Sequence, residues 1–356
     1  MIKMYSERIK KIHELVKKEN LDAVFLSGVD CTIPNIYYFT GFLDVFPSSF
    51  VVSDKSEWLL TFSPRKARIK TKIKQVVDLN DIRISEFLKK RGLDCGRIGI
   101  DGKEQYSFFE ALKKQLPGLT LVNISTQINS IRCVKDDFEL QKIRTACLLT
   151  DGVMEDVASE TIVGKNELQV ANIIKKAMLD KGKDWAFDTI VAGDTNSSFV
   201  HHVPEKIKFR NIALLDFGVK HDYYCADMAR MILLERKKEH KRAVDALKDV
   251  HALLDDYVKP GVPACNIHNF AKNRLIELGF KETNFGEFHA LGHSVGLEAH
   301  DGFGLSPKNT QPVLENMVLT LEPAIYFPGS FGVRLEDTIV VTKTGIKRLT
   351  KSSYDS

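Results

Sequence analysis

The chain has 356 residues, of which 44% are hydrophobic and 28% are charged, and its formal net charge is +4. This composition is typical of a globular protein that is long enough for two domains, each with its own core. The net charge is small and the lysines are spread along the chain, so we expect no nucleic-acid partner.

Cysteine spacing and hydropathy indicate the compartment. The six cysteines show no C-x-x-C spacing, which is typical of reduced thiols, and we expect a cytoplasmic protein. The N-terminal residues lack the apolar core of a signal peptide, and no stretch approaches transmembrane length, so we expect no membrane segment.

Helical and extended patterns alternate in residues 1–125. Residues 6–19 predict an amphipathic helix with apolar residues on one face and lysines opposite. Further helices are predicted at 84–91 and 107–115, and strands at 23–26, 50–52, 58–60, 98–100 and 119–124. Because this region contains no cluster of acids or histidines, we expect an α/β domain over 1–125 and the chemistry in a second domain over 126–356.

The second domain begins with predicted helices. One is expected over 135–160, and Asn166 with Gln169 resembles a capping box at the start of the next, which ends near Gly182. A strand over 186–192 and a loop over 193–201 follow. Later helices are expected at 239–258 and 267–278, the last of them capped by Asn266.

Two aspartates lie in a predicted hairpin. Its first strand is apolar except for Asp216, and its second strand carries Asp227. A turn at His221 and Asp222 would place these aspartates directly opposite each other, with their carboxylates about 5 Å apart. Such a pair repels, and a fold usually keeps it only when a cation or a shared proton lies between the two groups.

A second hairpin repeats the arrangement. Residues 318–323 and 332–337 flank a break at 328–329, and this register places Glu322 opposite Glu336. A single buried acid is more often structural, but two opposed acid pairs are harder to explain in that way. Each unpaired buried carboxylate would cost several kcal/mol.

The segment between the hairpins, residues 288–300, supplies imidazoles at His289, His293 and His300. Four carboxylates carry a charge that two divalent ions would cancel, and one neutral imidazole could complete a site of mostly hard oxygen ligands. These residues therefore predict two metals rather than one.

The motifs resemble those of the pita-bread metallopeptidases, and among them the proline-specific branch that contains Xaa-Pro dipeptidase (prolidase) and Xaa-Pro aminopeptidase (aminopeptidase P). The matching segments are 216–218, 227–230, 292–296, 320–323 and 333–337. The resemblance implies an α/β (α+β) protein with a creatinase-like N-terminal domain and a C-terminal pita-bread domain. In relatives the N-terminal domain helps to cover the active site and to build a dimer, so a homodimer is expected.

The resemblance also implies metal ligands. Asp216 is expected on one metal, His293 and Glu322 on the other, and Asp227 and Glu336 as bridges between them. Glu322 additionally matches the position proposed to transfer protons for the attacking water.

Further residues are expected around the substrate by resemblance: His201, His289, His300 and Arg334. His201 and His300 are also expected to take part in catalysis, the latter by stabilising the tetrahedral intermediate. The chain departs from the family pattern at Val200, His202 and Ser294, where a proline, a small residue and a glycine are common. These departures remove no ligand, but they bear on the substrate pocket.

The activity implied is that of a metal-dependent exopeptidase that hydrolyses the Xaa-Pro bond of a proline-containing di- or oligopeptide. Two metals can hold a bridging water and lower its pKa, so that hydroxide forms near neutral pH. Mn is the first candidate, and Co, Zn or Fe also fit oxygen-rich ligation with one imidazole.

Several alternatives stay open. The sequence does not separate a dipeptidase from an aminopeptidase P. A methionine aminopeptidase shares the five ligands but lacks this N-terminal domain. A creatinase-like hydrolase, and a non-enzymatic binding module on the same scaffold, would both lose ligands that are present here.

Overall fold

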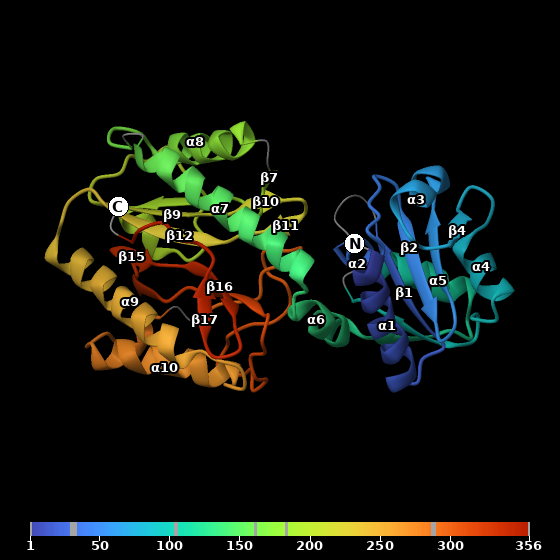
Figure 1. The fold of residues 1–356 in the computed structure, drawn as a ribbon. Coiled ribbons are helices and arrows are strands. Elements are labelled where there is room, and N and C mark those ends of the chain that lie inside the picture. The colour runs from blue at the N-terminus through green and yellow to red at the C-terminus, as the bar shows by residue number, and fades with distance from the viewer. Residues whose placement is uncertain are drawn as a thin grey trace. The chain divides into compact units, whose positions relative to one another are not determined.

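The computed structural model describes residues 2–28, 34–102, 106–159, 162–181, 184–285 and 290–354. The chain divides into two compact units, Met1–Ile131 and Arg132–Ser356, here called the N-terminal and C-terminal units (Figure 1). Within the described ranges, no helix combines the length and the apolar character needed to cross a membrane.

The N-terminal unit is built on one mixed sheet. Its strands in spatial order are β4 (Gln75–Asp78), β3 (Glu57–Thr61), β2 (Ser48–Ser53), β1 (Ala23–Gly28), β5 (Arg97–Ile100) and β6 (Thr120–Asn123). The pairs β1–β2 and β2–β3 are antiparallel, and the other neighbours are parallel. The predicted strands overlap β1, β2, β3, β5 and β6, whereas β4 was not predicted.

Helices accompany this sheet. They are α1 (Ile2–Lys18), α2 (Pro34–Thr40), α3 (Pro64–Lys70), α4 (Ile84–Lys90), α5 (Tyr106–Gln115) and α6 (Ser125–Cys133). Phe87 of α4 and Leu112 of α5 join a buried cluster with Phe25 and Trp58 of the sheet. The helices α1, α4 and α5 match predictions, whereas α2, α3 and α6 were not predicted.

The C-terminal unit contains several small antiparallel sheets. Their strands are β8 (Ile190–Gly193), β9 (Ile212–Phe217) and β12 (Met228–Leu233); β13 (Val318–Leu321), β16 (Asp337–Val341) and β17 (Ile346–Arg348); β14 (Ala324–Phe327) and β15 (Phe331–Arg334); and β7 (Asp184–Trp185), β10 (Val219–His221) and β11 (Tyr224–Cys225). The strand predicted over 186–192 is therefore only partly correct, and the expected loop contains a 3-10 helix, Asp194–Ser198.

Four long helices cover these strands: α7 (Asp137–Ser159), α8 (Glu167–Asp180), α9 (Lys238–Tyr257) and α10 (Ala264–Glu277). Figure 1 shows α7 and α8 on one side of β9 and β12, and α9 and α10 on the other. Alternate residues of β9 join two different buried clusters, Leu215 with α7 and α8, and Leu214 with α9 and α10. A strand covered on both faces in this way reads as a nearly continuous apolar run, which is why Asp216 stands out in the sequence.

Helix starts were predicted with mixed success. The capping box of α8 is confirmed, because Asn166 and Gln169 exchange side-chain and backbone hydrogen bonds. The predicted cap at Asn266 is wrong, since α10 begins at Ala264. The amides of Ala264 and Cys265 donate to carbonyl oxygens of 309–311, at 3.0 and 2.8 Å, so these helix-start donors need no side-chain cap.

The register predicted for the first acidic hairpin is wrong by two residues. Asp216 pairs with Ala229 rather than with Asp227. The turn lies at Asp222 and Tyr223, whose φ angles of 47° and 73° are those of a type I′ hairpin turn. A shift of two residues leaves a side chain on the same face of the sheet, so Asp216 and Asp227 become diagonal neighbours on one face.

The second acidic hairpin has the predicted register. Leu321 pairs with Asp337 and Ala324 pairs with Arg334. Glu322 and Glu336 lie between these two pairs, at the point where β13 passes into β14 and β15 passes into β16.

Candidate metal centre

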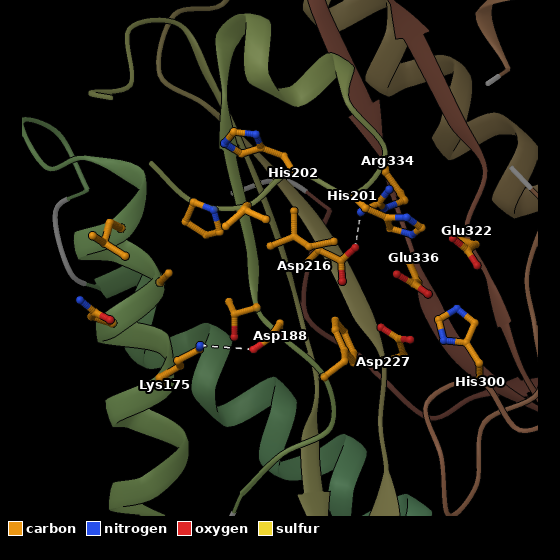
Figure 2. A pocket seen from close by; sticks show the side chains of 18 of the residues that line it. Lys175, Asp188, His201, His202, Asp216, Asp227, His300, Glu322, Arg334 and Glu336 are labelled. Carbon is orange, nitrogen blue, oxygen red and sulfur yellow. Dashed lines mark hydrogen bonds and ion pairs between the residues drawn. The ribbon is translucent and has the colours of Figure 1, made fainter. Parts of the chain in front are cut away.

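The predicted ligands line one end of a cavity of about 480 Å³ in the C-terminal unit. They are Asp216, Asp227, His293, Glu322 and Glu336. Figure 2 shows the four carboxylates gathered in one region of the cavity, although they come from two hairpins far apart in the sequence. The fold therefore brings together the two acid pairs that the sequence suggested.

Distances place the imidazole among the acids. His293 Nε2 lies 3.4 Å from Glu322 Oε1 and 3.7 Å from Asp227 Oδ2. One ligand atom from each of Asp227, His293 and Glu336 lies within 4.8 Å of the others. Oxygen donors with one imidazole suit hard or borderline divalent ions.

Backbone contacts hold His293 in place. Its amide donates to Thr320 Oγ1 at 2.9 Å, and the same hydroxyl lies 3.3 Å from Glu322 Oε1. A Cβ at Gly292 would collide with the Thr320 carbonyl oxygen, so a close approach of two backbones requires glycine there. The loop that carries the imidazole is thus fixed directly on β13.

Burial and mutual repulsion dominate the electrostatics of the acids. Burial raises the pKa of Asp227 and of Glu336 well above its usual range, and neighbouring carboxylates raise each pKa further. Burial, with the charge of Asp216, raises the pKa of Glu322 to about 8 although Arg334 opposes the shift. Such a cluster resists ionisation until cations compensate its charge.

The site fits divalent metal ions. Asp216 Oδ1 is buried and accepts no hydrogen bond from the described residues. A buried carboxylate oxygen without a partner is costly, and a cation supplies the missing partner. The other oxygen of Asp216 is paired with Arg334, which is itself fully buried.

Comparisons with known proteins decide the family. Residues 141–343 match metallopeptidase family M24, and residues 8–134 match the creatinase/prolidase N-terminal domain. The chain belongs to metallopeptidase family M24. The predicted fold, a creatinase-type N-terminal domain followed by a pita-bread domain, is confirmed.

This M24 chain resembles several relatives over nearly its full length. It is 30% identical to the Xaa-Pro dipeptidase of Pyrococcus horikoshii, covering 98% of both chains. The solved prolidase structure from that organism has a TM-score of 0.89 at 30% identity and covers 98% of this chain and 99% of its own. The X-Pro aminopeptidase of Thermotoga maritima has a TM-score of 0.86 at 25% identity and covers 98% of each chain.

Three more of the predicted residues of the M24 site line the same cavity. His201, His300 and Arg334 line it, whereas His289 lies outside the described residues. The rings of His293 and His300 stack with centroids 3.9 Å apart. Burial, together with the nearby His201, lowers the pKa of His300, which favours its neutral form at pH 7.

Arg334 lines this cavity of the M24 site and connects several of its segments. Its guanidinium pairs with Asp216 and donates to Tyr326 Oη at 2.9 Å and to the Val200 carbonyl oxygen at 3.1 Å. One buried cation therefore connects a predicted metal ligand with the loop that carries His201. Tyr326 was not predicted from the sequence, because an aromatic residue in an apolar strand is an ordinary core position.

A buried ionic cluster that the sequence did not indicate supports the His293 loop. Lys135 Nζ lies 2.7 Å from Ser294 Oγ and 3.2 Å from Asp301 Oδ2. Arg132 pairs with Asp301 and, at 3.0 Å, with Glu298. Ser294, one of the departures from the family pattern, is thus used as a hydrogen-bond partner next to His293.

Proposed function

We propose that this metallopeptidase hydrolyses the Xaa-Pro bond at the N-terminus of a di- or oligopeptide with the help of two divalent metals. The observation that carries the proposal is the convergence of four carboxylates and one imidazole on one cavity. Similarity over nearly the whole chain to Xaa-Pro dipeptidases and to an X-Pro aminopeptidase supports the substrate class.

The proposed ligand sets follow the positions of the acids. Asp216 would bind one metal, His293 and Glu322 the other, and Asp227 and Glu336 both. Asp227 and Glu336 are nearly fully buried. When bound, a pair of divalent ions polarises the scissile carbonyl and lowers the pKa of water, and we rank Mn before Co, Zn and Fe.

Proton transfer is assigned to Glu322. Its carboxyl group has a pKa of about 8 in the metal-free protein and lies 3.4 Å from His293. Positive charge bound beside it lowers that pKa, so the group can take a proton from water and return it to the leaving proline nitrogen.

Two imidazoles and the cavity bind the peptide in this proposal. His300, neutral at pH 7, offers an N–H to the oxygen on which negative charge develops, and His201 lines the same space. An Xaa-Pro bond has no N–H, so the substrate is recognised by shape and by its termini. A cavity of about 480 Å³ has the size of a small-molecule site.

We also propose a homodimer in the cytoplasm. The described cysteines are all free, and Cys133, Cys147 and Cys225 among them are buried, which fits a reducing compartment.

The proposed homodimer rests on the resemblance to dimeric relatives. Sedimentation equilibrium tests it, because a measured mass of 40.2 kDa would mean a monomer.

The substrate class is tested with three sets of peptides, each with and without Mn. Xaa-Pro dipeptides, Xaa-Pro-Xaa tripeptides and a Met-Ala-Xaa control separate the candidate activities. Hydrolysis of the dipeptides alone assigns a prolidase, and hydrolysis of the longer peptides assigns an aminopeptidase P. Hydrolysis of the control alone contradicts proline specificity and favours a methionine aminopeptidase.

A further inference from the structure

Glu167, at the start of α8, carries a fully buried carboxylate with four hydrogen bonds. Its Oε1 accepts from the Gly193 amide at 2.8 Å and from the Asn196 side chain at 3.0 Å. Its Oε2 accepts from His202 Nε2 at 2.7 Å and from the Glu205 amide at 2.9 Å. An ionised carboxylate offers about four acceptor sites, so this one is fully used.

All four donors belong to the segment 193–205, which connects β8 to β9 and carries His201. The segment contains a single 3-10 turn and no strand beyond Gly193, so its shape depends on such tethers. Within the described residues, no side-chain hydrogen bond fixes the His201 imidazole itself. The position of that imidazole must therefore be set through the neighbouring residues.

Both neighbours of His201 are anchored. On one side the Val200 carbonyl oxygen accepts from Arg334 at 3.1 Å, and on the other side His202 is held by Glu167. Figure 2 shows His201 beside Arg334 and the acids, whereas His202 lies apart from them. The two anchors thus bracket the residue that faces the acid cluster.

We propose that Glu167 and His202 are positioning residues that hold His201 toward the reacting peptide. The proposal rests on the proposed function, in which His201 contacts the substrate. A side chain without an N–H at position 202 would leave Glu167 Oε2 without its imidazole donor. The anchor at His202 is therefore placed one residue from a group of the site.

The main test compares His202→Ala with the unmodified, metal-loaded enzyme. We expect kcat to fall about 10- to 100-fold, because a displacement of about 1 Å in a positioning group can cost about 100-fold. Metal content should not change, since His202 and Glu167 do not touch the proposed ligands in the described structure. His202→Gln, which restores an N–H donor, should recover most of the rate.

A double substitution separates positioning from a general structural effect. If His202 acts through His201, adding His202→Ala to a His201→Ala enzyme should cause no further loss of kcat. The same fold loss in both backgrounds would overturn the proposal. A matched control is His13→Ala in the N-terminal unit, where the imidazole bonds the Ser53 carbonyl oxygen at 2.7 Å and lies 3.7 Å from Glu57.

NMR of the histidine side chains gives a second test that does not depend on hydrolysis. The His201 signal, assigned by its loss in His201→Ala, should shift in His202→Ala and in Glu167→Gln and should stay in place in His13→Ala. An unchanged His201 signal contradicts the proposal even if the enzyme is active. A shifted signal in a metal-loaded protein that leaves Xaa-Pro peptides intact contradicts the proposed function and leaves the positioning of His201 standing.

Discussion

Asp227→Asn should abolish peptide hydrolysis. The substitution keeps the shape of a nearly fully buried side chain but removes the charge that we assign to both metals. Loss of one oxyanion-hole donor alone costs about 100- to 1,000-fold, and loss of a ligand shared by two ions should lower kcat/KM by about 1,000-fold or more. Steady-state kinetics measure kcat/KM, and the metal content is determined on the same sample.

The matched control is Asp222→Asn at the turn of the same hairpin. Asp222 has a positive φ of 47°, which asparagine tolerates, and its carboxylate pairs with Lys142 at 2.6 Å outside the cavity. Its kcat/KM should stay within a factor of about two, since exposed ion pairs contribute little. An Asp227→Asn enzyme that retains turnover with two metals bound would contradict the bridging role.

Removing the metals should abolish hydrolysis reversibly and should change how stability depends on pH. In the metal-free protein the folded state keeps protons on Asp227, Glu322 and Glu336, whose pKa values are raised. The unfolded state releases them at the ordinary pKa values, 3.8 for aspartate and 4.5 for glutamate. The folded state then binds more protons, so the free energy of unfolding falls as pH rises toward 8.

The informative pH range is 6.5 to 8. Below it, several imidazoles act in the opposite direction, because desolvation lowers the pKa of His251 to about 4 and also lowers the pKa of His240, His268 and His300. Between pH 6.5 and 8 we expect the Tm of the metal-free protein to decrease. Added Mn should raise Tm most at pH 8, because fewer protons then compete with the metal for the carboxylates. At 100 times its Kd a ligand stabilises the folded state by about 2.7 kcal/mol.

Calorimetric scans at several pH values, with chelator and with excess Mn, measure both effects. Restoring Mn should restore hydrolysis. An unchanged rate of hydrolysis after chelation would contradict metal binding by these acids. A Tm of the metal-free protein that increases from pH 6.5 to 8 would contradict their raised pKa values.

The sequence predicted the acidic pairs better than it predicted their exact pairing. An acid inside an apolar strand is visible by its contrast, and this contrast identified Asp216 and Glu322. The register of the second hairpin was correct because the break at Pro328 and Gly329 locates its turn. The first register was wrong because Tyr223, an aromatic residue, occupies a turn position with positive φ that sequence patterns assign to Gly or Asn.

The contacts that support the site were not predictable. Glu167 is an ordinary acid in the first turn of a helix, and only the tertiary structure shows that its carboxylate is enclosed by 193–205. Arg334 was expected near the substrate, but its bonds to Asp216, Tyr326 and Val200 depend on three separate segments meeting. Such contacts have no periodic signature in the chain.

Anomalous diffraction from crystals grown with Mn tests the central claim most directly. We predict two adjacent Mn peaks in the cavity, with Asp227 and Glu336 contacting both, Asp216 on one, and His293 and Glu322 on the other. Two metals about 3.5 to 4 Å apart are the arrangement that such a site requires. A single peak, or peaks away from these five side chains in fully loaded and active protein, would contradict the account.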